Sequence, residues 1–155
     1  MKIKLIWIGK TNQSYLNEGI SIYIKRLKHY TKLEIIEIKD IKNFTSKEDL
    51  KIKEGQALLS KLTPEDFTIL LDEKGKTYSS VLWAKKLESF QNQGKRCIAF
   101  IIGGAFGFHN DVYKRANGML ALSNMTFSHQ MIRLFFLEQL YRGYTIIKNE
   151  KYHNE

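Results

Sequence analysis

Two segments in the second half of the chain have residue types suited to binding a small ligand. Residues 103–107 read Gly-Gly-Ala-Phe-Gly after an apolar run, and glycines there let a backbone turn sharply or approach a ligand closely. Residues 122–128 read Leu-Ser-Asn-Met-Thr-Phe-Ser and present hydroxyls, an amide and backbone donors before a helix, where an adenosine or a carboxylate can bind. The alternative interpretations are a tight turn and a helix-capping loop.

The C-terminal residues form a third group with chemical potential. Tyr152 offers a ring for stacking, His153 offers an imidazole that can exchange a proton, and Glu155 adds carboxylates. Such a set could handle a nucleobase. Because chain termini usually fray, the residues alone favour a disordered tail.

Other reactive side chains indicate structural roles. Cys97 opens a buried strand with no histidine nearby, which is typical of a structural thiol rather than a nucleophile. The four histidines share no ligand spacing, so we predict no metal. Asp72 and Glu73 could hold a ribose hydroxyl or form a turn. Glu138 and Arg142 are four residues apart, as in an ordinary surface pair of a helix.

Length and composition predict one globular domain, residues 1–155, of which 43% are hydrophobic. Lys and Arg number 25 against 16 Asp and Glu, and the net charge of +9 favours a polyanionic partner. The densest basic stretch, residues 25–32, contains Lys25, Arg26 and Lys28, although a solvated helix face explains it equally well. No segment is long and apolar enough to span a membrane, and we expect a cytoplasmic protein with no membrane contact.

The hydrophobic pattern predicts strands that alternate with helices. The expected strands are 2–8, 33–38, 67–71, 97–102 and 118–123, with residues 72–76 as a turn. Helices are expected from about 15 to 30, from a Ser46 cap to a stop at Pro64, from Ser79 or Ser80 to Gly94, from Asn110 or Asp111 to Asn117, and from a Ser128 cap through Tyr144. This order predicts an α/β fold with a mostly parallel sheet flanked by helices, in which ligands bind at the carboxyl ends of the strands.

Seven short motifs in order make the chain resemble the RlmH-type family of the SPOUT superfamily over essentially its whole length. They are Met1-Lys2-Ile3-Lys4-Leu5, Leu70-Leu71-Asp72, Ile102-Gly103-Gly104-x-x-Gly107, Leu122-Ser123-x-x-Thr126, His129-x-x-x-Arg133, Glu138-Gln139-Leu140-Tyr141-Arg142 and Tyr152-His153-x-Glu155. Three positions depart from the family pattern. Ala105-Phe106 replaces Pro-Glu or Pro-Tyr, Ser128 replaces proline, and Asn154 replaces a basic residue.

The resemblance implies a C-terminal trefoil knot, a homodimer and S-adenosylmethionine as cofactor. Carried over by position, the cofactor would be held near Leu71, Gly103 and the loop Ser123, Asn124, Met125, Thr126, Phe127 and Ser128. The tail of one subunit would reach the cofactor site of its partner.

The implied reaction is methylation of N3 of pseudouridine 1915 in 23S rRNA of the assembled ribosome. His153 would act near the N3 proton and Tyr152 would orient the base. Arg133 and Arg142 would contact phosphates or the other subunit, and Lys25, Arg26 and Lys28 the rRNA backbone. The alternatives are a SPOUT methyltransferase acting on another RNA such as tRNA, and a non-catalytic ribosome-associated RNA-binding protein.

Overall fold

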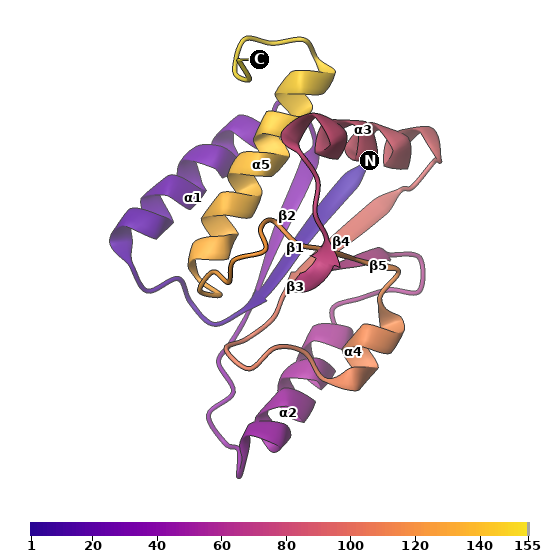
Figure 1. Ribbon diagram of the computed structural model, residues 1–155. Coiled ribbons are helices and arrows are strands. Elements are labelled where there is room, and N and C mark those ends of the chain that lie inside the picture. Colours follow the sequence, from indigo (N-terminus) through magenta and orange to yellow (C-terminus); the bar gives the residue numbers. More distant parts are fainter. Residues whose placement is uncertain (155) are drawn as a thin grey trace.

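The computed structural model describes residues 1–154, in which strands and helices alternate along the chain (Figure 1). The strands are β1 (Lys2–Ile8), β2 (Lys32–Ile38), β3 (Phe67–Lys76), β4 (Cys97–Ile102) and β5 (Gly118–Leu120). The helices are α1 (Ser14–Leu27), α2 (Lys47–Leu59), α3 (Ser80–Asn92), α4 (Asn110–Arg115) and α5 (Met131–Ile147).

The five strands form one parallel sheet in the order β2-β1-β4-β3-β5. Alternate residues of the strands face opposite sides, as the two-residue period of a strand requires. Ile3, Leu5 and Phe100 belong to one hydrophobic cluster, and Ile6 and Ile101 belong to the other. The predicted α/β class with a parallel sheet is therefore confirmed.

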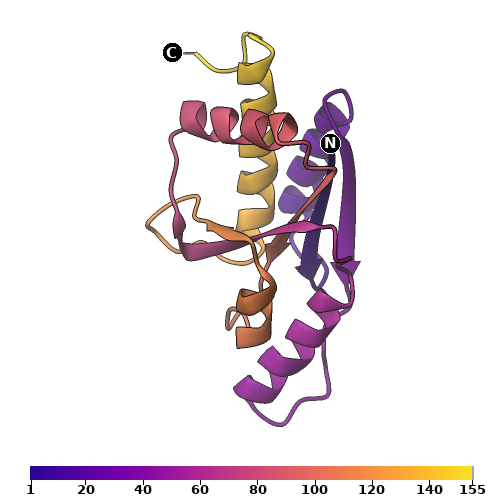
Figure 2. The ribbon, with the colours of Figure 1, turned by 90° about the vertical axis from the view of Figure 1, so that its right-hand side faces the viewer.

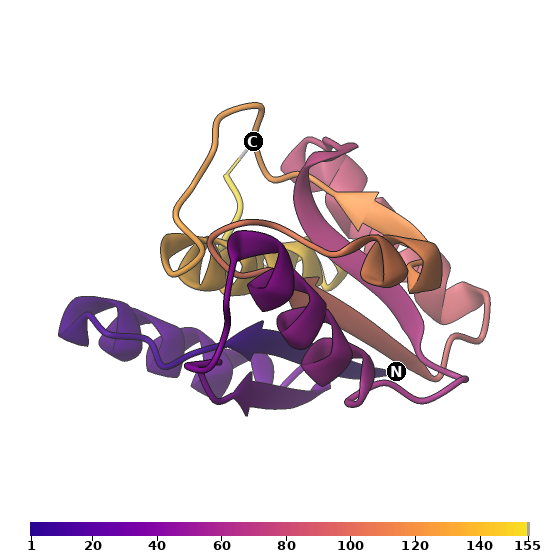
Figure 3. The same ribbon diagram turned by 90° about the horizontal axis from the view of Figure 1, so that it is seen from below.

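The helices cover the two faces unequally. Residues of α1, α3 and α5 complete the larger cluster, and α5 packs between the other two helices. Residues of α2 and α4 complete the smaller cluster on the opposite face, together with Phe108. Figure 2 shows the first group of helices above the second, and Figure 3 shows α2 and α4 beside the strand ends from below.

Several of the predicted helix caps and stops are confirmed. The Ser46 and Ser79 hydroxyls accept hydrogen bonds from the backbone NH of Asp49 and Leu82, as N-caps do. Gly94 has a φ of +69°, the left-handed conformation that commonly ends a helix.

Other boundaries differ from the prediction. Helix α2 ends at Leu59, before Pro64. Helix α4 begins at Asn110 as predicted, with the His109 ring accepting a hydrogen bond from the Asp111 NH, but it ends at Arg115 instead of Asn117. Strand β5 stops at Leu120 instead of residue 123, and α5 begins at Met131, with the Ser128 hydroxyl accepting a hydrogen bond from the Met131 NH.

The main correction concerns residues 72–76, which form no separate turn. Strand β3 continues to Lys76, and Leu120 of β5 pairs with both Leu71 and Lys76, so the intervening residues bulge out. The Asp72 carboxylate accepts from Lys74 NH within this bulge. Local turn chemistry was visible in the sequence, but pairing with β5 decided that the strand resumes afterwards.

None of the described helices has both the length and the apolar character needed to cross a membrane.

Candidate active site

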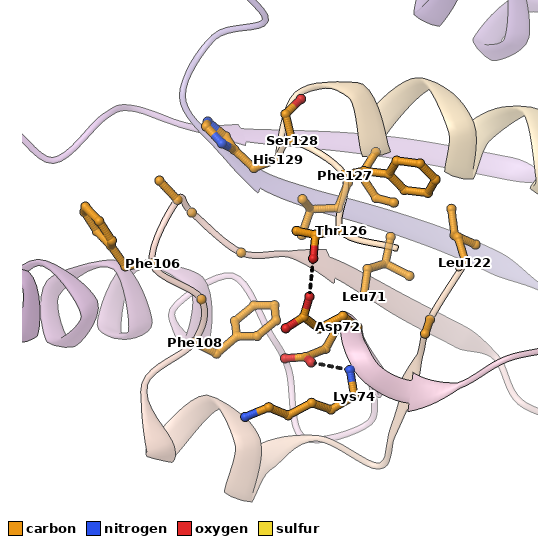
Figure 4. A pocket seen from close by; sticks show the side chains of 18 of the residues that line it. Leu71, Asp72, Lys74, Phe106, Phe108, Leu122, Thr126, Phe127, Ser128 and His129 are labelled. Atoms are coloured by element: carbon orange, nitrogen blue, oxygen red, sulfur yellow. Dashed lines mark hydrogen bonds between the residues drawn. The ribbon is translucent and has the colours of Figure 1, made fainter. Parts of the chain in front are cut away.

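A cavity of about 710 Å³ lies where β3, β4 and β5 end at the carboxyl edge of the sheet. Figure 4 shows the side chains that surround it, with Leu71 and Asp72 from β3 opposite Thr126 and Phe127 from the loop before α5. Of the predicted cofactor residues, Leu71, Gly103, Ser123, Met125, Thr126, Phe127 and Ser128 line the cavity. Asn124 is exposed and is not part of this lining.

Two carboxylates from the bulge in β3 tie the cavity walls together. The Tyr113 hydroxyl donates to Asp72 over 2.6 Å, and the Thr126 hydroxyl donates to Glu73 over 2.6 Å. Burial, followed by the bond to Asp72, raises the pKa of Tyr113 to about 12. Tyr113 is therefore a neutral donor at working pH and holds Asp72 toward the cavity.

The glycine loop 103–107 forms a second wall. Gly104 and Gly107 form an isolated bridge, and Gly107 has a φ of +79°, which favours glycine. A Cβ on Gly104 would lie 2.5 Å from a carboxylate oxygen of Glu54 in α2. Glu54 is 8% exposed, and burial together with the nearby Asp40 raises its pKa. The loop therefore follows its path because Gly104 leaves room for a buried acid behind it.

A hydrogen bond to the hydroxyl of Ser123 shapes the loop 123–128. The Ser123 side chain accepts a hydrogen bond from Met125 NH over 2.9 Å, which turns the backbone at the cavity rim. Met125 is 76% exposed, and Phe127 packs against Phe135 of α5 with ring centroids 4.9 Å apart. This segment thus both lines the cavity and leads into α5.

Arg133, which was predicted to contact a phosphate or the other subunit, is buried inside the fold. It is 1% exposed and donates to the carbonyls of Ile8 and Gly9 and to the hydroxyl of Thr11 over 2.7–3.0 Å. These bonds hold the loop after β1 against α5. Burial, followed by the charge of Arg133, lowers the pKa of His129, which also lines the cavity.

The tail is ordered through residue 154, so the expectation of a frayed terminus is wrong for those residues. Tyr152 shares a 3.0 Å hydrogen bond with the Tyr23 hydroxyl and donates to Glu138 over 3.1 Å. Arg142 bonds to Glu138 over 2.6 Å, and its guanidinium lies 3.1 Å from His153 Nδ1. The predicted pair of Glu138 and Arg142 exists, and it anchors the tail. Glu155 lies outside the described residues.

The tail and the cavity lie at opposite ends of α5. The helix begins next to the cavity, near Ser128 and Ile132, and its 17 residues span about 25 Å before the tail starts. Figure 1 shows the last described residues, in yellow, at the top, away from the carboxyl ends of the strands. The predicted basic residues Lys25, Arg26 and Lys28 are exposed at the C-terminal end of α1. The Arg26 guanidinium there lies 5.5 Å from the Tyr141 ring centroid.

Cys97 lies at the amino end of β4, at the opposite edge of the sheet from the cavity. Burial, followed by a hydrogen bond with Asp66, raises its pKa to about 11, so the thiol stays protonated. Within residues 1–154, no three side chains of His, Cys, Asp or Glu are grouped to hold a metal ion.

Several cavity residues were not singled out from the sequence. They are Lys51, Phe108, Tyr113 and Ile132. Their helices and loops were predicted, but nothing in the spacing indicated which side chains would turn toward the strand ends.

Comparison with known proteins decides the family. A family model described as "Predicted SPOUT methyltransferase" matches residues 1–153. The chain belongs to this family. The prediction of a SPOUT methyltransferase from the ordered motifs is thus confirmed.

Relatives of this SPOUT methyltransferase match over nearly their full lengths. A protein of Flavobacterium psychrophilum is 54% identical over 100% of both chains. Others from Cytophaga hutchinsonii and Trichlorobacter lovleyi are 50% and 42% identical over 99% of this chain and 100% of theirs. Each is named "Ribosomal RNA large subunit methyltransferase H".

Proposed function

We propose that this protein methylates N3 of pseudouridine 1915 in 23S rRNA of assembled ribosomes, with S-adenosylmethionine as methyl donor. The observation that carries the proposal is the cavity at the ends of β3, β4 and β5, built from the segments the family resemblance assigns to the cofactor. Family membership and the rRNA methyltransferase relatives support the reaction class.

The cavity has the size and chemistry of a cofactor site. Its volume of about 710 Å³ lies within the roughly 300–1,000 Å³ of small-molecule sites. Leu71, Ile102 and Leu122 offer apolar surface for an adenine ring, and the loops 103–107 and 123–128 offer backbone groups at close range. These residues would hold the cofactor, and Asp72 and Glu73 would face its hydroxyls or its ammonium group.

The sulfonium of S-adenosylmethionine supplies an already activated methyl group. The chain must then orient the base and accept the N3 proton of pseudouridine. We assign His153 to that proton, a role worth about 10²–10⁴-fold in rate. Burial and the bonds to Tyr23 and Glu138 raise the pKa of Tyr152. Tyr152 therefore stays neutral and orients the base, rather than acting as a base itself.

The separation of tail and cavity leads us to include a homodimer in the proposal. Within one chain, α5 holds the tail about 25 Å from the cavity its other end borders. A second subunit that docks along α5 can bring its own tail to that cavity. The same docking would carry Lys25, Arg26 and Lys28 toward the partner's cavity, where they would contact rRNA phosphates. Arg142 would act through the tail it holds.

We extend the proposal to the whole chain. Residues 1–155 form one methyltransferase domain that works in the cytoplasm, where its ribosomal substrate is. The trefoil knot that the family carries would bring the loops 103–107 and 123–128 together.

The decisive test supplies labelled S-adenosylmethionine to the purified protein with ribosomes that lack the modification. We expect one methyl group per ribosome, recovered after digestion as N3-methylpseudouridine, and little transfer to naked 23S rRNA. Label on tRNA, or on another rRNA nucleotide, would contradict the assigned substrate. Unchanged methylation by His153→Ala with normal cofactor affinity would contradict the proton role.

A further inference from the structure

Phe106 stands out among the residues around the cavity because its ring is partly in solvent. It occupies the glycine loop at the cavity mouth and is 44% exposed. The ring belongs to neither of the two hydrophobic clusters of the core. In Figure 4 it lies at the edge of the view, toward a helix, whereas Phe108 lies closer to Asp72. Its burial therefore does little for the fold.

A lysine from another element covers part of this ring. The ammonium of Lys47, the first residue of α2, lies 4.9 Å from the Phe106 ring centroid. Lys47 is exposed and forms no ion pair with the residues that the structure describes. The acids next to it are engaged elsewhere, since Asp49 pairs with Lys53 over 3.1 Å and Glu48 lies 3.8 Å from Lys51.

An exposed ring beside an unpaired cation is complementary to a nucleotide of single-stranded RNA, which has a flat base and a negative phosphate. The ring can stack on a base of any identity, and the ammonium can contact the adjoining phosphate. A second cation, Lys51, lines the same cavity mouth. An apolar protein partner would leave Lys47 to be desolvated without an opposite charge, so charge complementarity favours RNA.

We propose that Phe106 and Lys47 form a binding site for one unpaired nucleotide of the RNA substrate next to the target base. The inference rests on the proposed function and adds a residue pair to its substrate contacts. Stacking on Phe106 would fix the position of the strand as the target base enters the cavity, while Lys47 holds the phosphate.

The first experiment measures methylation of unmodified ribosomes by Phe106→Ala, Phe106→Leu and Phe106→Tyr. We expect Phe106→Ala and Phe106→Leu to raise KM for ribosomes about 5- to 150-fold, the range for loss of one base stack, with kcat nearly unchanged. Phe106→Tyr keeps an aromatic face and should restore KM. Phe44→Ala is the matched control, because Phe44 is 45% exposed and lies outside the cavity lining.

The second experiment measures binding of single-stranded oligo(A) and oligo(U) RNA at several salt concentrations. Lys47→Ala should weaken both and lower the slope of log affinity against log salt by about 0.7, the value for one lost phosphate contact on a single strand. Phe106→Ala should weaken both without changing that slope.

Other outcomes would overturn the inference. Unchanged KM and RNA affinity in Phe106→Ala would remove the stacking role. A loss confined to S-adenosylmethionine affinity would make Phe106 part of the cofactor wall, and dissociation in sedimentation would make it a contact between subunits. If the wild-type protein binds RNA through Phe106 but transfers no methyl group to ribosomes, the proposed function fails and the RNA contact stands.

Discussion

At the scale of single residues, Arg133 shows how a motif residue can act on the fold. It lies four residues after His129, and it was expected to contact a phosphate or the other subunit. In the structure, its guanidinium satisfies the carbonyls that end β1 and lies 4.9 Å from the centroid of the Trp7 ring. Those carbonyls stand at the carboxyl edge of the sheet, so Arg133 links α5 to the edge that carries the cavity.

We expect Arg133→Gln to lower the free energy of unfolding by about 2–4 kcal/mol, because three buried acceptors lose their charged donor. Arg26→Gln, at an exposed arginine, should change it by no more than about 0.5 kcal/mol. Urea unfolding of both variants measures the difference. Equal losses of unfolding free energy in the two variants would contradict the structural role of Arg133. An Arg133→Gln variant that keeps wild-type stability but binds ribosomes more weakly would instead support a contact between Arg133 and RNA.

A second buried charge lies at the opposite edge of the sheet. The Lys4 ammonium contacts the Asp66 carboxylate over 2.7 Å, and their side chains are 11% and 2% exposed. Burial alone would raise the pKa of Asp66, but the bonds from Lys4 and Thr63 NH outweigh it and lower the pKa to about 2. The pair therefore stabilises the fold above the usual aspartate pKa of 3.8, and this contribution is lost as the pH falls through about 2.

We predict that Asp66→Asn costs about 3–5 kcal/mol at pH 7, since it leaves the Lys4 ammonium buried without a counter-charge. The difference in unfolding free energy between wild type and variant should narrow as the pH falls from about 4 toward 2. Chemical unfolding across this pH range tests it, with Glu65→Gln at the exposed neighbouring position as control. A gap that stays constant with pH would show that the ion pair is not its source.

At the scale of elements, the bulge in β3 decides the shape of the cavity. The excursion between Leu71 and Lys76 carries Asp72 and Glu73 toward α4 and the loop before α5, where Tyr113 and Thr126 bind them. Gly75 makes this possible, because a Cβ there would lie 2.6 Å from the backbone nitrogen of Leu120.

Gly75→Ala should therefore destabilise the protein by about 1–3 kcal/mol and weaken S-adenosylmethionine binding, as β5 is pushed from β3. Gly118→Ala is the matched control on the same strand pair, since a Cβ there would have no atom within 4 Å beyond its chain neighbours. Thermal unfolding and calorimetry measure both effects. Tolerance of alanine at residue 75 would mean that the bulge does not shape the site.

At the scale of the whole molecule, the arrangement places the two parts of the proposed active site at opposite ends of α5. The cavity borders the start of the helix, and the tail is fixed to its end by Glu138, Arg142 and Tyr23. These contacts hold the tail in a defined position. The net charge of +9 adds long-range attraction to rRNA.

Two inactive variants should restore each other if sites are shared between subunits. His153→Ala keeps the cavity and loses the tail group, while Gly103→Val blocks the cavity, because even a Cβ there would lie 3.1 Å from the Phe108 ring. Co-expressed in equal amounts, they should form mixed dimers with one complete site each, or about a quarter of wild-type activity. No recovery, despite mixed dimers seen by mass spectrometry, would show that each tail serves its own chain.

The sequence alone determined the alternation of strands and helices, the parallel sheet and the loops at its carboxyl edge. These follow from local periodicity, glycine and capping residues, which act over a few positions. The ordered motifs also predicted the protein family. The tertiary structure alone decided that Arg133 is buried, that β3 resumes after its bulge, that the tail docks on α1 and α5, and that Phe106 meets Lys47. Each of these depends on residues far apart in the chain, 124 positions for Arg133 and Gly9 and 129 for Tyr23 and Tyr152, and no local pattern encodes which of many distant partners a side chain meets.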